Sequence, residues 1–355
     1  MPGLTMIMTP EQDCASLLSS SISIGEVADR LAAMQHQEST PYRCRDYIDN
    51  DNKTTMCSPS LRRPRQQQRG PQEHQIIDRD CRLKMCEWCY QVSDFCKFQR
   101  ETVAIGMDYL DRFLSTSSPR AIRALCDKKE FQLVAMASLY IAIKLFEPLA
   151  MDAGLLAQIS HGCYTEMDVV DMEQEILTSL LWRMNGPTTH AFLSHIMTLL
   201  PPSAYGYDKT TAMALLDFSR FQAEIAVSDY DLSLQKPSTL ALAAILNSIE
   251  GIEMSLFPAR SRFQFFQLIA DASGMNPFSS EVNVARARLL ELFSQSSGYE
   301  MPQIANLTPV IKAIQCYMEQ KFPNNTIPQT MSSPVCVCVS RHFAAERGTY
   351  GAKCA

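Results

Sequence analysis

The stretch that decides the fold is EFQLVAMASLYIAIKLF, residues 130–146. Its apolar side chains fall on nearly every side of a helix instead of along one stripe, which indicates a helix surrounded by other helices. Elsewhere in the chain, amphipathic helical spacing is frequent and strand-like alternation is not convincing. The sequence therefore predicts an all-α fold in which this segment is a central helix.

Four helices are expected around the central one, at residues 82–98, 101–115, 152–160 and 165–182. The last of them begins with Thr165 and Asp168, whose spacing is that of a capping box. Asn185, Gly186 and Pro187 then end the helical run. Five more helices follow, at residues 188–200, 208–227, 237–249, 258–272 and 280–295. The third is again the most uniformly apolar, which predicts an internal structural repeat.

The sequence divides into two helical units with an arm on each side. Residues 1–70 are expected to be a mostly disordered N-terminal arm, with one candidate short helix at 41–49. The two helical units are placed at residues 71–185 and 186–298. An extra helix is expected at 299–322, and a flexible tail at 323–355.

Composition and charge exclude several classes of protein. The chain has 355 residues, of which 46% are hydrophobic, and this excludes disorder of the whole chain. The net charge of −6 argues against direct binding of nucleic acid. No secretory signal opens the sequence, and the longest apolar runs are shorter than the roughly 18 residues needed to span a membrane. Thirteen cysteines without an export signal indicate reduced thiols in the cytosol or nucleus.

No cofactor, metal or catalytic site is predicted. Cys81, Cys86 and Cys89 follow a C-x4-C-x2-C spacing typical of some iron-sulfur proteins. They lie on a predicted helix, however, whereas cluster ligands need an irregular loop, so we interpret them as small apolar residues. The histidines are scattered, and no nucleophile elbow, phosphate-binding loop or dinucleotide fingerprint is present.

Several motifs carry a resemblance to a known family. DYLDRFLS (108–115) is preceded by CRLKMCEWCYQV (81–92) and followed by EFQLVAMASLYIAIKLFEP (130–148) and DMEQEIL (171–177). In order, spacing and residue type this series resembles the cyclin box, and YLDRFL looks most like A- and D-type cell-cycle cyclins. The resemblance covers residues 71–184 and continues more loosely to about 295. It implies two tandem five-helix cyclin-fold repeats with flexible N- and C-terminal arms.

The same resemblance implies a function. Cyclins are regulatory subunits, not enzymes, and each forms a heterodimer with a cyclin-dependent Ser/Thr protein kinase and activates it. A role in cell-cycle control, in the nucleus and cytoplasm, is therefore expected. The alternative is a cyclin-fold protein of transcription regulation, a transcriptional cyclin or a protein resembling general transcription factor IIB. The latter predicts an N-terminal zinc ribbon and basic helix faces, which the sequence lacks.

Two charged residues match the positions with which cyclins reach main-chain groups of the kinase. They are Lys144 in AIKLFEP and Glu173 in DMEQEIL. By position, the other expected kinase-facing residues are Leu145, Phe146, Glu147, Leu177 and Trp182. Trp182 fits an interface anchor and a core residue equally well. The family usually has two acidic residues after this Lys and its aromatic neighbour, and the first of them is missing here.

Two further groups of residues match the opening of the box. Arg82 and Asp111 resemble a structural pair that ties the first helix to the second. The residues Met85, Trp88, Gln91 and Gln132 fall on the patch with which many cyclins dock substrates or inhibitors. Cys81 and Lys84 depart from the usual residues there, and a lysine would repel a basic peptide, so docking at this patch is left open.

Overall fold

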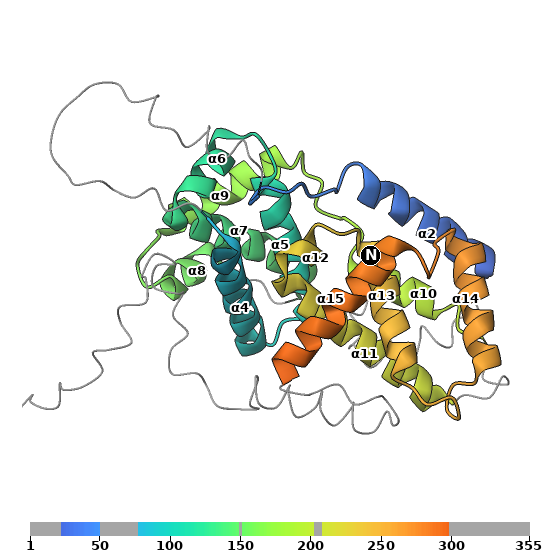
Figure 1. The fold of residues 1–355 in the computed structure, drawn as a ribbon. Coiled ribbons are helices and arrows are strands. Elements are labelled where there is room, and N and C mark those ends of the chain that lie inside the picture. The colour runs from blue at the N-terminus through green and yellow to red at the C-terminus, as the bar shows by residue number, and fades with distance from the viewer. Residues whose placement is uncertain (1–22, 50–76, 149–150, 202–207, 298–355) are drawn as a thin grey trace, which may run out of the picture.

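The structure, a computed structural model, describes residues 23–49, 77–148, 151–201 and 208–297 (Figure 1). These residues form 13 helices and no strand, which confirms the predicted all-α fold for the described part of the chain. The helix expected at 299–322 and the tail expected at 323–355 lie outside the described residues, as does most of the predicted N-terminal arm.

The first unit is built around one buried helix. Its helices are α4 (Arg79–Cys96), α5 (Arg100–Leu114), α6 (Pro119–Cys126), α7 (Lys128–Phe146), α8 (Ala153–Ile159) and α9 (Glu166–Ser179). Every residue of α7 from Phe131 to Ile143 is buried, and α7 contacts all five of the others. The continuous apolar run in the sequence thus becomes the central helix of the unit, as predicted.

The second unit repeats this plan. Its helices are α10 (Thr189–Met197), α11 (Lys209–Ser228), α12 (Tyr230–Ser233), α13 (Pro237–Glu250), α14 (Ala259–Ser273) and α15 (Ser280–Ser297). Here α13 is the central helix, because every residue from Ser238 to Ile249 is buried. The short helices α6 and α12, which the sequence did not predict, occupy the same place in each unit, between the second and third of the five main helices.

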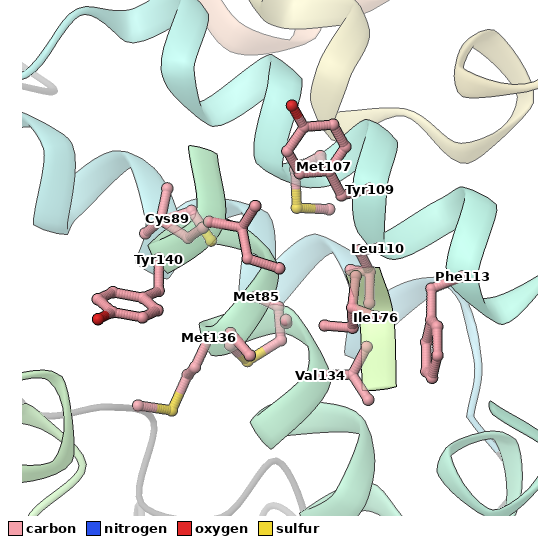
Figure 2. Packing of buried hydrophobic residues seen from close by; sticks show 14 of the residues in the cluster. Met85, Cys89, Met107, Tyr109, Leu110, Phe113, Val134, Met136, Tyr140 and Ile176 are labelled. Atoms are coloured by element: carbon pink, nitrogen blue, oxygen red, sulfur yellow. The ribbon is translucent and has the colours of Figure 1, made fainter. Parts of the chain in front are cut away.

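Close packing of α5 on α7 depends on a glycine. A Cβ atom built on Gly106 would lie 3.0 Å from the Cα atom of Leu139, so a larger residue would push the two helices apart. Figure 2 shows the core beside this contact, where side chains of several helices meet. Those labelled there are Met85 and Cys89 from α4, Met107, Tyr109, Leu110 and Phe113 from α5, Val134, Met136 and Tyr140 from α7, and Ile176 from α9.

The prediction of a helix at 41–49 is wrong, and so is the prediction of disorder for residues 23–49. A helix does precede the first unit, but it is α2 (Ile24–Ser39), which begins with a capping box formed by Ser23 and Glu26. Its buried face packs against α10 and α14 of the second unit (Figure 1). Residues 41–49, hereafter the strap, are turns and irregular backbone. Several of their backbone N–H groups donate to side chains of other elements, and a group bonded in this way cannot also form the hydrogen bond of a helix.

The strap is held by two tyrosines. The hydroxyl of Tyr230, at the start of α12, accepts hydrogen bonds from the backbone N–H groups of Tyr47 at 2.8 Å and Ile48 at 3.0 Å. The two tyrosine rings meet edge to face, with centroids 5.2 Å apart. The Tyr47 hydroxyl donates to Oδ1 of Asp111 at 2.7 Å, which connects the strap to α5. Burial, reinforced by the charge of Asp111, raises the pKa of the Tyr47 phenol well above its usual value.

The predicted pair of Arg82 and Asp111 forms, and both members are buried. Nε of Arg82 lies 2.9 Å from Oδ1 of Asp111, and Nη2 lies 2.7 Å from Oδ2, so the contact is bidentate. The exposed fractions of the two side chains are 1% and 4%. Nη1 of Arg82 donates to the backbone oxygen of Val227, at the end of α11, at 2.8 Å. One guanidinium therefore joins α4, α5 and the second unit.

At its other end the strap rests on the linker between the units. A Cβ atom built on Gly186 would lie 2.7 Å from Cδ1 of Tyr42, so only glycine allows this close approach. The guanidinium of Arg112 lies over the Tyr42 ring, 4.7 Å from its centroid, and donates to the backbone oxygen of Arg183 at 2.7 Å. The strap thus touches both units and the segment between them.

Replacement of Asp111 with Asn should strongly destabilise the fold. The change removes the negative charge facing a fully buried guanidinium, and breaking one half of such a pair typically costs about 3–5 kcal/mol. We expect a loss of this size in the free energy of unfolding, measured by urea denaturation. The matched control is Asp80→Asn, which breaks an exposed pair with Lys84 on α4 and should cost less than about 1 kcal/mol. Equal losses for the two variants would contradict the role assigned to Asp111.

Candidate protein-binding site

Lys144 and Glu173, predicted separately from two motifs, form an ion pair. Nζ of Lys144 lies 2.7 Å from Oε1 of Glu173, and the exposed fractions of the two side chains are 41% and 13%. Lys144 is in the last turn of α7, where a cation also interacts favourably with the helix dipole. Partial burial would lower the pKa of Lys144, but the hydrogen bond and charge of Glu173 outweigh it and raise that pKa. The lysine is therefore held charged at the surface.

Large apolar side chains next to this pair are exposed. Leu145 and Phe146 follow Lys144 at the end of α7, with exposed fractions of 53% and 38%. Leu181 and Trp182, just after α9, are 68% and 69% exposed. The core interpretation of Trp182 is therefore wrong. Leu177 is half-buried and packs against the core of the first unit. Large apolar and aromatic side chains exposed together are typical of a protein-binding surface.

The backbone that presents Leu181 and Trp182 is left-handed. Helix α9 was predicted to run to Trp182 but ends at Ser179, and the φ angles of Leu181 and Trp182 are 54° and 59°. Each such angle costs a residue other than glycine roughly 1–2 kcal/mol. The backbone N–H of Trp182 donates to the oxygen of Leu177 at 2.9 Å, which helps to hold the turn. Strain of this kind persists mostly where a side chain must be placed for function.

Three contributors were missed from the sequence. Met167, Val170 and Leu181 are exposed; the first two share the helical spacing of Glu173 and Leu177 along α9, and Leu181 lies in the turn just after that helix. The signal for Met167 and Val170 was available, because counting back from Glu173 in steps of three residues reaches both of them. We call this surface the α7/α9 face and define it by Lys144, Leu145, Phe146, Met167, Val170, Glu173, Leu177, Leu181 and Trp182.

Glu147 differs from the other predicted kinase-facing residues. Its Oε1 atom accepts a hydrogen bond from the backbone N–H of Gln99 at 2.8 Å, and another from the hydroxyl of Thr102. Gln99 is the N-cap of α5 and has no capping hydrogen bond from its own side chain. The Glu147 carboxylate therefore satisfies donors at the start of α5, where helix N–H groups lack internal partners. The position of the Glu147 carboxylate is therefore explained by contacts within the chain, without a kinase partner.

The predicted docking patch is not an exposed surface. Met85, Trp88 and Gln132 are buried, and only Gln91 is exposed. The patch prediction is therefore wrong for these three side chains. The physical reason is their place on the inner faces of α4 and α7, where Met85 and Trp88 belong to the core of the first unit.

The cysteines of the C-x4-C-x2-C spacing are also core residues. Cys81, Cys86 and Cys89 are buried on α4. Burial raises the pKa of Cys86 to about 11, so its thiol keeps its proton at neutral pH. Among the described residues there is no group of three or more His, Cys, Asp or Glu side chains that could hold a metal ion. Within the same residues, no helix is both long and apolar enough to cross a membrane.

Comparison with known proteins identifies the class. Residues 33–185 match the family described as the cyclin N-terminal domain, a segment that includes the strap, the Arg82–Asp111 pair and the whole α7/α9 face. The fold of the first unit is therefore that of a cyclin box. Residues 33–185 therefore carry a divergent cyclin N-terminal domain, and the curated relatives that the chain matches are named as cyclins.

Its relatives are distant. Cyclin-A1-1 of Arabidopsis thaliana is 26% identical over 51% of this chain and 37% of its own length. Cyclin-B2-2 of the same plant is 30% identical over 49% of this chain and 37% of its own length. G1/S-specific cyclin-E1 of Danio rerio is 24% identical over 68% of this chain and 57% of its own length. The chain thus spans about half the length of the curated relatives it matches, or less.

Among solved structures, a viral cyclin from herpesvirus saimiri shares 19% sequence identity with this chain. The alignment covers 62% of this chain and 89% of the viral one, with a TM-score of 0.47.

Truncation of the surface ion pair should leave the fold intact. Water reaches this pair through Lys144, which is 41% exposed, and ion pairs at the surface contribute about 0–1 kcal/mol to stability. We therefore expect Lys144→Ala and Glu173→Ala each to change the free energy of unfolding by less than about 1 kcal/mol in urea denaturation. A loss above about 2 kcal/mol would mean that the pair is a structural element of the box.

Glu147→Ala should have a different effect. Loss of the carboxylate leaves two donors at the start of α5 without this acceptor, and loss of a helix cap typically costs about 0.5–2 kcal/mol. We expect a decrease in this range, measured by the same denaturation, and partial recovery in Glu147→Gln, which keeps one oxygen acceptor. Full stability of Glu147→Ala would show that the contact with Gln99 and Thr102 contributes nothing.

Proposed function

We propose that this chain is a regulatory subunit that binds a cyclin-dependent Ser/Thr protein kinase through the α7/α9 face and activates it. The chain itself carries out no catalytic step in this proposal. The match of residues 33–185 to the cyclin N-terminal domain supports the proposal, as do the names of its relatives. The observation that carries it is the ion pair of Lys144 and Glu173 at 2.7 Å, set among exposed apolar side chains.

The ion pair suits recognition of a backbone. An ammonium has three donors and a carboxylate two acceptor oxygens, so each can hold the other and still bond to a partner. Nζ of Lys144 can thus reach a backbone oxygen of the kinase while Glu173 reaches a backbone N–H. Once the kinase covers the pair, both bonds lie away from water, where charge-assisted hydrogen bonds are strong. The flanking leucines and Trp182 would supply the apolar contact area.

The kinase would be activated because the α7/α9 face would bind its regulatory helix. In protein kinases the catalytic Lys must pair with a Glu on a mobile regulatory helix. A rigid surface bound to that helix would hold it inward and keep the kinase's pair formed. We expect the interface to bury roughly 2,000 Å² or more, the size class of lasting regulatory complexes. Burial of α7 gives the surface the rigidity this requires, because Lys144 extends from a helix fixed by five neighbours.

We further propose that the kinase acts in cell-cycle control and that the complex occupies nucleus and cytoplasm. The printed name of the Danio rerio relative, a G1/S-specific cyclin, supports the first part. A basic cluster in the N-terminal arm, Arg62, Arg63, Arg65 and Arg69, is consistent with nuclear import, although a solvated linker would have the same composition.

A kinase capture experiment tests the proposal. Full-length protein is immobilised, exposed to cell extract and assayed for bound kinase activity on a substrate with a Ser-Pro or Thr-Pro site. We expect the unmodified chain to retain an active kinase and Lys144→Ala and Glu173→Ala to retain far less. Loss of one member of a desolvated pair costs about 2–5 kcal/mol, or roughly 30-fold to several thousand-fold in affinity.

The matched controls are Lys84→Ala and Asp80→Ala. These residues form an exposed ion pair on α4, away from the α7/α9 face, with a distance of 2.6 Å between Nζ and Oδ2. They should retain the kinase as well as the unmodified chain does. Capture of no kinase, or equal capture by all five proteins, would contradict the proposal and leave a cyclin fold with another role.

A further inference from the structure

The second unit carries an exposed aromatic surface that the proposed function does not use. Phe263 on α14 is 63% exposed, and Phe278, in the turn after that helix, is 67% exposed. Phe266 connects them, because it follows Phe263 by one helical turn and its ring meets that of Phe278 edge to face, with centroids 6.0 Å apart. Ala270, one turn further along, is also exposed. We call these four residues the α14 face.

The α14 face is distinct from the side of the helix that belongs to the core. Phe265 and Ile269 are the buried aromatic and aliphatic residues of α14, and they pack in the core of the second unit. Single exposed apolar residues are common on protein surfaces, but side chains that are exposed together and contact one another typically mark a surface that another segment or protein covers. The α14 face therefore has the character of a binding surface.

The described chain begins next to this helix. Helix α2 packs against α14, and Figure 1 shows the beginning of α2 beside it. Val27 and Leu31 of α2 are buried in this contact region, whereas Ile24, one turn earlier on the same side of α2, is 55% exposed. The apolar side of α2 thus extends beyond the surface that covers it. Residues 1–22 are joined to the chain at this point, through Ser23.

The sequence of residues 1–22 supplies apolar side chains within reach of the α14 face. Leu17 and Leu18 lie five and six residues before Ser23, and five residues can span up to about 17 Å. Helix α14 has 15 residues and is therefore about 22 Å long. Leucines attached this close to α2 can reach the exposed rings without any change in the described fold.

Charge complementarity points to the same segment. Arg260, in the first turn of α14, is exposed and forms no ion pair with another described residue. That turn contains no acidic residue, and a cation there is unfavourable in the field of the helix dipole. Residues 1–22 include Glu11 and Asp13 but no lysine or arginine. Asp13 precedes Ser23 by ten residues, which can span up to about 33 Å, so its carboxylate can reach Arg260 from the end of α2.

We propose that residues 11–22 of this chain bind along the α14 face. Leu17 and Leu18 cover the exposed rings of Phe263 and Phe278, and the acidic residues before them lie toward the first turn of α14. The covalent connection favours this segment over a free partner, because a tethered group has an effective concentration on the order of millimolar. The N-terminal arm then shields the apolar surface of the second unit, and this role does not depend on kinase binding.

Photo-cross-linking of the full-length protein tests the proposal. The probe is p-benzoyl-phenylalanine in place of Phe263, which keeps an aromatic side chain at an exposed position. After irradiation of a dilute sample and digestion, mass spectrometry locates the linked peptide. We expect a cross-link within one chain to residues 11–22. Leu17→Ser combined with Leu18→Ser should lower its yield roughly fivefold or more, because burial of leucine side chains favours binding.

Two controls accompany the probe. Ser19→Ala combined with Ser20→Ala changes two neighbouring residues of the arm without removing apolar side chains, and it should leave the yield unchanged within about twofold. The same probe in place of Phe95, which is 51% exposed on α4 of the first unit, should form no cross-link to residues 11–22. Circular dichroism and thermal unfolding establish that each protein is folded.

Several results would overturn the proposal. A cross-link from position 263 to residues 298–355 would mean that the other end of the chain covers the α14 face. A product of twice the chain mass would mean that a second copy does so. The proposal also fails if no cross-link forms at position 263, or if the double leucine variant gives the same yield as the unmodified arm.

Discussion

The buried contact between Arg82 and Asp111 is the constraint on which the arrangement of the described chain depends. Removing two charges from water is costly, and the cost is offset only when geometry is good and the remaining polar atoms are bonded. Here the contact is bidentate, Tyr47 donates to the same carboxylate, and Val227 accepts from the same guanidinium. Together these bonds connect α4, α5, the strap and α11. The pair can therefore be satisfied only when strap, first unit and second unit are all in place.

The position of the α7/α9 face depends on the packing of the first unit. Helix α7 is buried from Phe131 to Ile143, so Lys144, the next residue, has little freedom to move. Packing of α9 on α7 then sets Glu173 within hydrogen-bonding distance of that lysine. The left-handed turn after α9 exposes Leu181 and Trp182 instead of returning them to the core. A rigid surface of this kind loses little conformational entropy when a partner binds.

Much of this arrangement was predictable because it depends on local sequence patterns. The apolar run at 130–146 predicted the central helix, and the spacing of Thr165 and Asp168 predicted a capping box that the structure contains. The positions of Lys144 and Glu173 followed from family motifs. The strap was not predictable, because its backbone is fixed by partners as distant in sequence as Tyr230. The left-handed turn was missed for a related reason, since leucine and tryptophan give no local signal for positive φ. Burial of Met85 and Trp88 depends on packing that a motif does not describe.

Hydrogen exchange of the full-length chain, alone and with a kinase captured from extract, tests the central claim most directly. The account predicts slower backbone exchange on complex formation in residues 141–147 and 166–184, the segments that carry the α7/α9 face. Exchange in α14 and α15, which lie in the second unit, should be unchanged. Protection confined to the second unit, with the ends of α7 and α9 exchanging as in the free protein, would contradict the assignment of this face as the kinase-binding surface.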